Sequence, residues 1–165
     1  LLILLILSFG NCVYKHFFVT EGLLSSTTVE NAIATDQITI VINRMSNIFD
    51  ETYCMKMDGW AFIGGDQDQA LFDKQMILRN DQQVFSLETK KIELTKAPAG
   101  MENVINWEAS GFSSCLSKYA LDVGKSYVLG MKFRNIQTNE EFIGYTTYDL
   151  VRTPNKILIG RVTKK

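Results

Sequence analysis

Short segments in which apolar and polar residues alternate recur along this chain, and turn-forming residues separate them. The clearest is 126–134, where Tyr127, Leu129, Met131 and Phe133 alternate with polar or small residues. A period of two places such side chains on one face of a β-strand, because successive strand residues point to opposite sides. Comparable segments occupy 38–43, 55–63, 75–79, 83–87, 91–95, 141–148 and 156–162. The pattern therefore predicts about seven to nine short strands.

The order of these segments predicts how they are layered. Strands follow one another without intervening amphipathic helices, which excludes a βαβ arrangement and favours two packed antiparallel sheets. We therefore expect an all-β, immunoglobulin-like antiparallel β-sandwich, with one helical turn near 117–121. Its expected core comprises the large apolar residues Trp60, Phe62, Phe112, Tyr127, Leu129 and Phe133.

The first seven residues are all Leu or Ile, and the apolar stretch runs on to Tyr14. As a helix, 1–14 would extend about 21 Å, whereas a bilayer core needs about 30 Å. We therefore expect 1–20 to be an apolar helical anchor, part of a longer transmembrane or signal segment. Residues 21–36 are expected to be a linker and 37–165 the β-sandwich domain. Three alternatives stay open for the anchor: a lipoprotein signal ending at Cys12, a pilin-like helix, and a helix buried against the domain.

Composition excludes several classes of function. The net charge is −1, and the closest approach to a basic run is Lys90-Lys91 with Lys96 beyond it, interpreted as a solvated strand edge; nucleic-acid binding is therefore not expected. A single histidine, His16, lies outside the expected domain, so no Ser-His-Asp or Cys-His arrangement can form within it. None of the three cysteines forms a CxxC pair and only one histidine is present, so a structural zinc site is not expected. We expect neither catalysis nor a cofactor.

The cysteines Cys54 and Cys115 leave two interpretations open. Their separation is similar to that of the inter-sheet disulfide in immunoglobulin domains, and an extracytoplasmic domain could form that bond. The tyrosine expected two residues before the second cysteine is Ser113 here. Two separate buried thiols are favoured for this reason, because free cysteine packs as a small hydrophobe.

Four motifs in order resemble a β-sandwich domain of bacterial envelope proteins. They are Gly59-Trp60-Ala61-Phe62, Ile77-Leu78-Arg79, Ser110-Gly111-Phe112, and the segment 121–130, whose motif residues are Leu121, Gly124, Tyr127 and Gly130. In that group the domain is attached to membrane proteins of surface-polysaccharide metabolism, such as integral-membrane glycosyltransferases. The resemblance covers about 53–150 and implies a non-catalytic accessory domain outside the membrane. An Arg-Pro-Asp-Val-like stretch of the group is replaced here by Ile92-Glu93-Leu94-Thr95.

Two sets of residues are candidates for a site. Asp66 and Asp68 form a DxD pair in a glycine-led loop, which could hold a divalent cation but is also common turn chemistry. Trp107, flanked by Asn106 and Glu108, is the expected exposed aromatic of a sugar-binding site.

The expected function is a non-catalytic module, membrane-anchored and extracytoplasmic, in the periplasm or at the cell surface, that binds or scaffolds cell-envelope components. A carbohydrate-binding module is the first alternative. The second is a pilus or filament subunit that self-associates through its apolar segment. The expected partners are the membrane, through 1–20, and a glycan or other envelope proteins.

Overall fold

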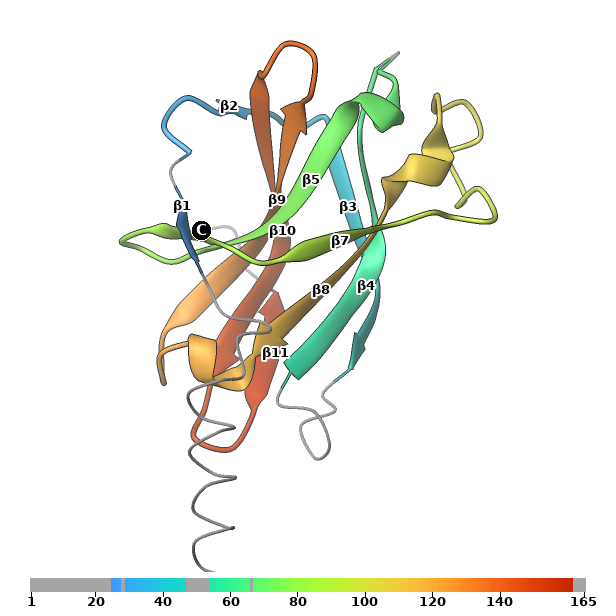
Figure 1. Cartoon of the computed structure of the whole chain (residues 1–165). Coiled ribbons are helices and arrows are strands. Elements are labelled where there is room, and N and C mark those ends of the chain that lie inside the picture. The colour runs from blue at the N-terminus through green and yellow to red at the C-terminus, as the bar shows by residue number, and fades with distance from the viewer. Residues whose placement is uncertain (1–24, 28, 47–53, 66, 162–165) are drawn as a thin grey trace, which may run out of the picture.

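The chain forms two β-sheets packed face to face, as a computed structural model shows (Figure 1). The structure describes residues 25–27, 29–46, 54–65 and 67–161. The all-β sandwich expected from the sequence is confirmed. The predicted N-terminal helix at 1–20 lies outside the described residues.

The larger sheet has seven strands, and the smaller has four. In spatial order the large sheet contains β1 (Ser25–Thr27), β6 (Val84–Ser86), β5 (Phe72–Arg79), β9 (Ser126–Asn135), β10 (Glu141–Arg152) and β11 (Ile157–Arg161), with β2 (Ile33–Ala34) also paired to β10. The small sheet contains β3 (Ile38–Ser46), β4 (Cys54–Ile63), β8 (Gly111–Ser117) and β7 (Thr89–Ile92). Three single-turn 3-10 helices lie between strands: η1 (Gln69–Leu71), η2 (Trp107–Ser110) and η3 (Lys118–Ala120).

Alternation along each strand builds the core between the sheets. In β9 the side chains of Tyr127, Leu129, Met131 and Phe133 are at most 1% exposed. They pack in one cluster with residues of the small sheet, among them Phe112. Four of the six predicted core residues, Phe112, Tyr127, Leu129 and Phe133, thus lie in the core.

The prediction that Trp60 and Phe62 belong to the core is wrong. In β4 the buried face is formed by Met55, Met57, Ala61 and Ile63, so the alternate residues Trp60 and Phe62 point to the outside of the small sheet. Both are half-buried. The small residues Gly59 and Ala61 occupy the inner face of β4, where Gly59 lies opposite the bulky ring of Phe112. The larger residues Trp60 and Phe62 therefore point outward, although their size had suggested that they point into the core.

Side-chain amides fix two of the turns between strands. Asn80 Oδ1 accepts hydrogen bonds from the backbone N–H groups of Gln82 and Gln83, between β5 and β6. Asn135 Oδ1 likewise accepts from Gln137 and Thr138, between β9 and β10. Such Asx turns satisfy backbone donors where the ladder ends, and they set the register of both hairpins.

The segment 21–36 was expected to be a linker, and this is wrong for two parts of it. Ser25–Thr27 pairs with β6, and Ile33–Ala34 pairs in parallel with β10. With these two short strands the described residues form eleven strands, more than the seven to nine expected. The strands β1 and β2 are only three and two residues long, too short for an alternating pattern to predict them. Within the described ranges, none of the helices has the length and apolar character to cross a membrane.

Candidate functional site

A row of apolar residues crosses the outer face of the small sheet. Trp60 and Phe62 stack with ring centroids 5.9 Å apart and an angle of 22° between their planes. Trp60 stands opposite Val41 on β3 and Gly111 on β8, and Gly111 stands opposite Ile92 on β7, which is 39% exposed. We call Val41, Trp60, Phe62 and Ile92 the aromatic row. It places an indole and a phenyl ring on an outward-facing sheet surface.

A polar row runs beside the aromatic row, one pleat further along the strands. Asp58 lies opposite Arg44 on β3 and Ser113 on β8, and Ser113 lies opposite Lys90 on β7. Ser113 Oγ donates to Asp58 Oδ1 at 2.6 Å, and Lys56 Nζ lies 3.8 Å from Asp58 Oδ2. This face therefore offers flat aromatic surface next to hydroxyl, carboxylate and ammonium groups.

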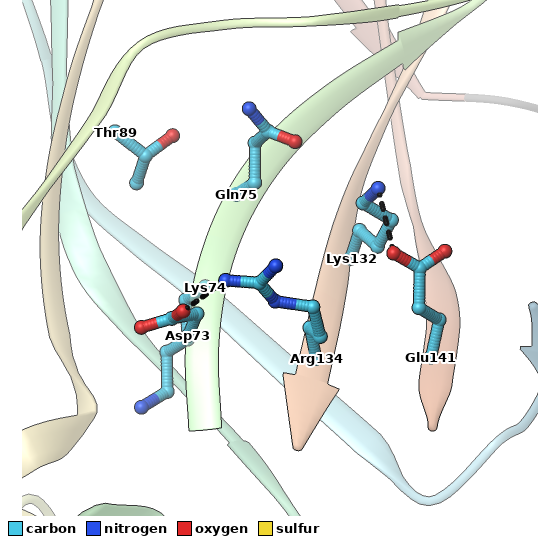
Figure 2. Close-up of a pocket in the computed structure, with 7 residues that line it drawn as sticks. All are labelled: Asp73, Lys74, Gln75, Thr89, Lys132, Arg134 and Glu141. Carbon is cyan, nitrogen blue, oxygen red and sulfur yellow. Dashed lines mark hydrogen bonds and ion pairs between the residues drawn. The ribbon is translucent and has the colours of Figure 1, made fainter. Parts of the chain in front are cut away.

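A second hollow lies where β5 and β9 of the large sheet meet β7. Figure 2 shows its charged side chains on three neighbouring strands: Asp73 reaches Arg134, with Oδ2 and Nη2 2.7 Å apart, and Lys132 reaches Glu141, with Nζ and Oε1 3.1 Å apart. The hollow has a volume of about 330 Å³. The hydrogen bond from Arg134 to Asp73 raises the pKa of the guanidinium, which therefore stays charged.

Lys74 is the buried cation at this hollow. Its Nζ donates to the carbonyl of Ala109 at 2.9 Å and that of Gln69 at 3.4 Å, and it lies 5.5 Å from the centre of the Phe133 ring. Burial lowers the pKa of the amine to about 8, and the positive charge of Lys91 adds to this effect, whereas Asp73 opposes it.

The structure brings together three of the predicted site residues at the η1–η2 end. Asn106 Nδ2 donates to Asp68 Oδ1 at 2.8 Å, and Glu108 lines a shallow hollow of about 580 Å³ beside Asn106. Asp68 Oδ1 also accepts from the backbone N–H of Ala70 and so caps η1. Trp107, the first residue of η2, is half-buried.

These contacts favour a structural role for Asp68. Its carboxylate oxygen is already bonded to a turn and an amide. Asp66, its predicted partner in cation binding, lies outside the described residues. In the parts of the chain that the structure describes, no three His, Cys, Asp or Glu side chains gather in a way that could hold a metal ion.

The cysteines differ from the arrangement that the sequence favoured. Cys115 is disulfide-bonded, so the expectation of a free thiol at this position is wrong. The pairing of Cys54 with Cys115 stays a prediction, because the side chain of Cys54 is outside the described set. The backbones of both residues lie on neighbouring strands of the small sheet, β4 and β8. A bond between them would join strands within one sheet rather than bridge two sheets.

Sequence reasoning weighed Trp60 and Phe62 as a sugar-stacking surface but favoured the core for both, and it missed the charged hollow. The aromatic row contains a tryptophan that was placed in the core, and the charged hollow draws residues from four strands far apart in the chain. The available signal for the first was that Gly59-Trp60-Ala61-Phe62 alternates small and large residues. For the hollow, no local pattern links the residues.

Comparison of the chain with protein-family models, with curated proteins and with solved structures finds no match.

Proposed function

We propose that this chain is a non-catalytic, extracytoplasmic binding module of the cell envelope, and that it binds glycan on the aromatic row of the small sheet. The observation that carries the proposal is the Trp60–Phe62 stack on the outer face. A folded domain gains most from large aromatics when they are buried. A pair held outside the core, in an ordered strand, is a surface suited to recognition.

The chemistry of the two rows fits a sugar. The face of a pyranose ring carries C–H groups that pack on an aromatic face, and its edge carries hydroxyls that need hydrogen-bond partners. The aromatic row supplies the flat apolar surface. Asp58, Ser113 and Lys56 supply acceptors and donors one pleat away. The carbohydrate-binding alternative and the envelope module thus become one proposal.

The disulfide of Cys115 supports the proposed compartment. Disulfides persist in oxidising compartments and are rare in the cytosol. Attachment to a membrane through 1–20 is proposed on the apolar sequence of that segment alone. The immunoglobulin-like character of the sandwich belongs to the same proposal; it is supported by the split into two mostly antiparallel sheets.

The test is binding to an array of bacterial surface oligosaccharides, with the full chain held in detergent micelles. We expect the wild type to bind at least one glycan and Trp60→Ala to weaken that binding by about tenfold or more, the loss of one stacking contact worth about 1–2 kcal/mol. Trp107→Ala is the matched control, since it removes a half-buried tryptophan that lies on η2 rather than on a strand of the small sheet.

Three outcomes would contradict the proposal. One is that the wild type binds no glycan. Another is that Trp107→Ala loses binding while Trp60→Ala keeps it, which would return the site to the η1–η2 end. The third is that Phe62→Leu, which keeps an apolar side chain and guards against misfolding of the first variant, binds as well as the wild type.

A further inference from the structure

Basic side chains line an opening between β5 of the large sheet and β7 of the small sheet. Two adjoining hollows of about 330 Å³ and 200 Å³ share Asp73, Lys74 and Thr89. We call the combined space the seam. Its charged lining consists of five basic residues and two acidic ones: Lys74, Lys90, Lys91, Lys132, Arg134, Asp73 and Glu141. With all of them ionised the seam carries a net charge of +3.

The two carboxylates of the seam already form ion pairs. Asp73 pairs with Arg134, and Glu141 pairs with Lys132. Within the described part of the chain, neither Lys74 nor Lys91 forms an ion pair. Lys74 instead donates to two backbone carbonyls. Two ammonium groups therefore share the smaller hollow with the carboxylate of Asp73, which is already paired with Arg134.

The surroundings make this arrangement of like charges costly. Lys74 is mostly buried, and its amine lies near the ring of Phe133, while Phe112 forms part of the floor of the smaller hollow. Repulsion between like charges is stronger where water is partly excluded. An anion placed between the two amines would relieve this repulsion and form charge-assisted hydrogen bonds.

We propose that the seam is a binding site for an oxyanion, a carboxylate or phosphate group held between Lys74 and Lys91. The site lies along the β5–β7 edge and uses side chains that point into the gap, so it is distinct from the aromatic row. It does not depend on the proposed glycan function. Both oxyanions present negatively charged oxygen acceptors to ammonium donors.

Binding at the seam is coupled to a proton on Lys74. The charged groups that line the two hollows together with Lys74 are Asp73 beside it on β5, Lys90 and Lys91 on β7, Lys132 and Arg134 on β9, and Glu141 on β10. Because the pKa of Lys74 is about 8, the amine is mostly charged at pH 7 and mostly neutral above pH 9. The bound oxyanion favours the charged form and raises this pKa.

The experiment follows the side-chain resonances of the lysines by NMR, with the full chain in uncharged detergent at constant ionic strength. Inorganic phosphate and glucuronate are the two probes, with chloride as the reference salt. We expect the Lys74 signal to shift and saturate with one or both probes, and the affinity to fall about tenfold between pH 7 and pH 9. Phosphate alone acting would assign the site to phosphate groups, and glucuronate alone to carboxylates.

Lys74→Met is the test variant, and Lys56→Met, on the outer face of β4, is its matched control. Lys74→Met should abolish the saturable shift of Lys91, whereas Lys56→Met and Trp60→Ala should leave it unchanged. The proposal is overturned if neither probe gives a saturable shift up to about 50 mM, a dissociation constant too weak to be specific. It is overturned equally if all lysines shift alike, or if Lys91 responds as before in a folded Lys74→Met protein.

Discussion

Gln69 is fully buried, and its carboxamide forms hydrogen bonds with the backbone of β4 in the small sheet. Oε1 accepts from the N–H of Ile63 at 3.1 Å, and Nε2 donates to the carbonyl of Ile63 at 3.0 Å and to that of Gln67 at 2.9 Å. The amide thereby satisfies both backbone groups of the last residue of β4. A buried polar group without a partner would cost free energy, so Gln69 ties η1 firmly to the sheet.

We expect Gln69→Leu to lower the free energy of unfolding by about 2–4 kcal/mol, since it leaves two buried backbone groups unpaired. Urea denaturation of both proteins measures the difference. Gln82→Leu, at an exposed turn, is the control and should change stability by less than about 0.5 kcal/mol. A loss of under about 1 kcal/mol for Gln69→Leu would mean that water replaces the amide.

Lys74 should make stability depend on pH in the alkaline range. Its pKa is lowered from 10.5 to about 8 in the folded protein, so between these values the unfolded chain binds more protons than the folded one. Stability therefore rises with pH across this window, and the penalty for burying the charged amine is greatest below about pH 8.

Lys74→Met removes this titration. We expect the wild type to gain about 2 kcal/mol relative to the variant between pH 7 and pH 9.5, measured by urea denaturation in buffer free of phosphate. An equal pH dependence of the two proteins would show that the amine keeps its ordinary pKa in the fold.

At the scale of elements, β4 illustrates what the sequence can and cannot predict. Its length and position were predicted well, because alternation is local. Which face of β4 is buried was predicted wrongly. Both faces near Trp60 are apolar, and the choice is made by Phe112 across the ladder, which no local pattern reveals.

Gly59 is the residue that permits this choice. A side-chain carbon added there would collide with the carbonyl of Val41 and approach the ring of Phe112 to 3.0 Å. The collision with backbone would force β3 and β4 apart beside the register shift between Ile42 and Arg44.

We expect Gly59→Ala to cost about 2–3 kcal/mol of stability, as overpacking of a core does. The thermal midpoint of unfolding measures it, with Gly64→Ala as the control just beyond the end of the same strand. There the nearest atom would be 3.3 Å away, and a small adjustment suffices. Equal melting temperatures for the two variants would contradict this prediction and would mean that β3 and β4 move apart at little cost.

For the whole molecule, the sandwich is a frame that separates two surfaces. The aromatic row occupies the outer face of the small sheet, and the seam opens where β5 and β7 meet. The site residues predicted from the sequence lie at a third place, the end of the sandwich that carries η1 and η2. There Asp68 caps η1 and accepts a hydrogen bond from Asn106. Sites built from several distant strands leave no spacing in the sequence, so only the fold could assemble them.

The disulfide of Cys115 should affect the stability of the whole molecule. The registers Cys54 with Ser117 and Cys115 with Lys56 place the two cysteine backbones diagonally across β4 and β8. If they pair, the bond closes a loop of about 60 residues and constrains the unfolded chain, which is worth about 2–4 kcal/mol. Protein exported to an oxidising compartment should hold this bond, and protein kept in a reducing cytosol should not.

Peptide mapping of the full chain under non-reducing conditions should recover one linked pair, with Cys54 and Cys115 joined and Cys12 absent from it. Reduction should then lower the melting temperature, and Cys115→Ser should melt at the reduced value with or without reductant. A link from Cys12 to Cys115 would instead fasten the apolar segment to the domain. No link in exported protein would remove the main structural support for the proposed compartment.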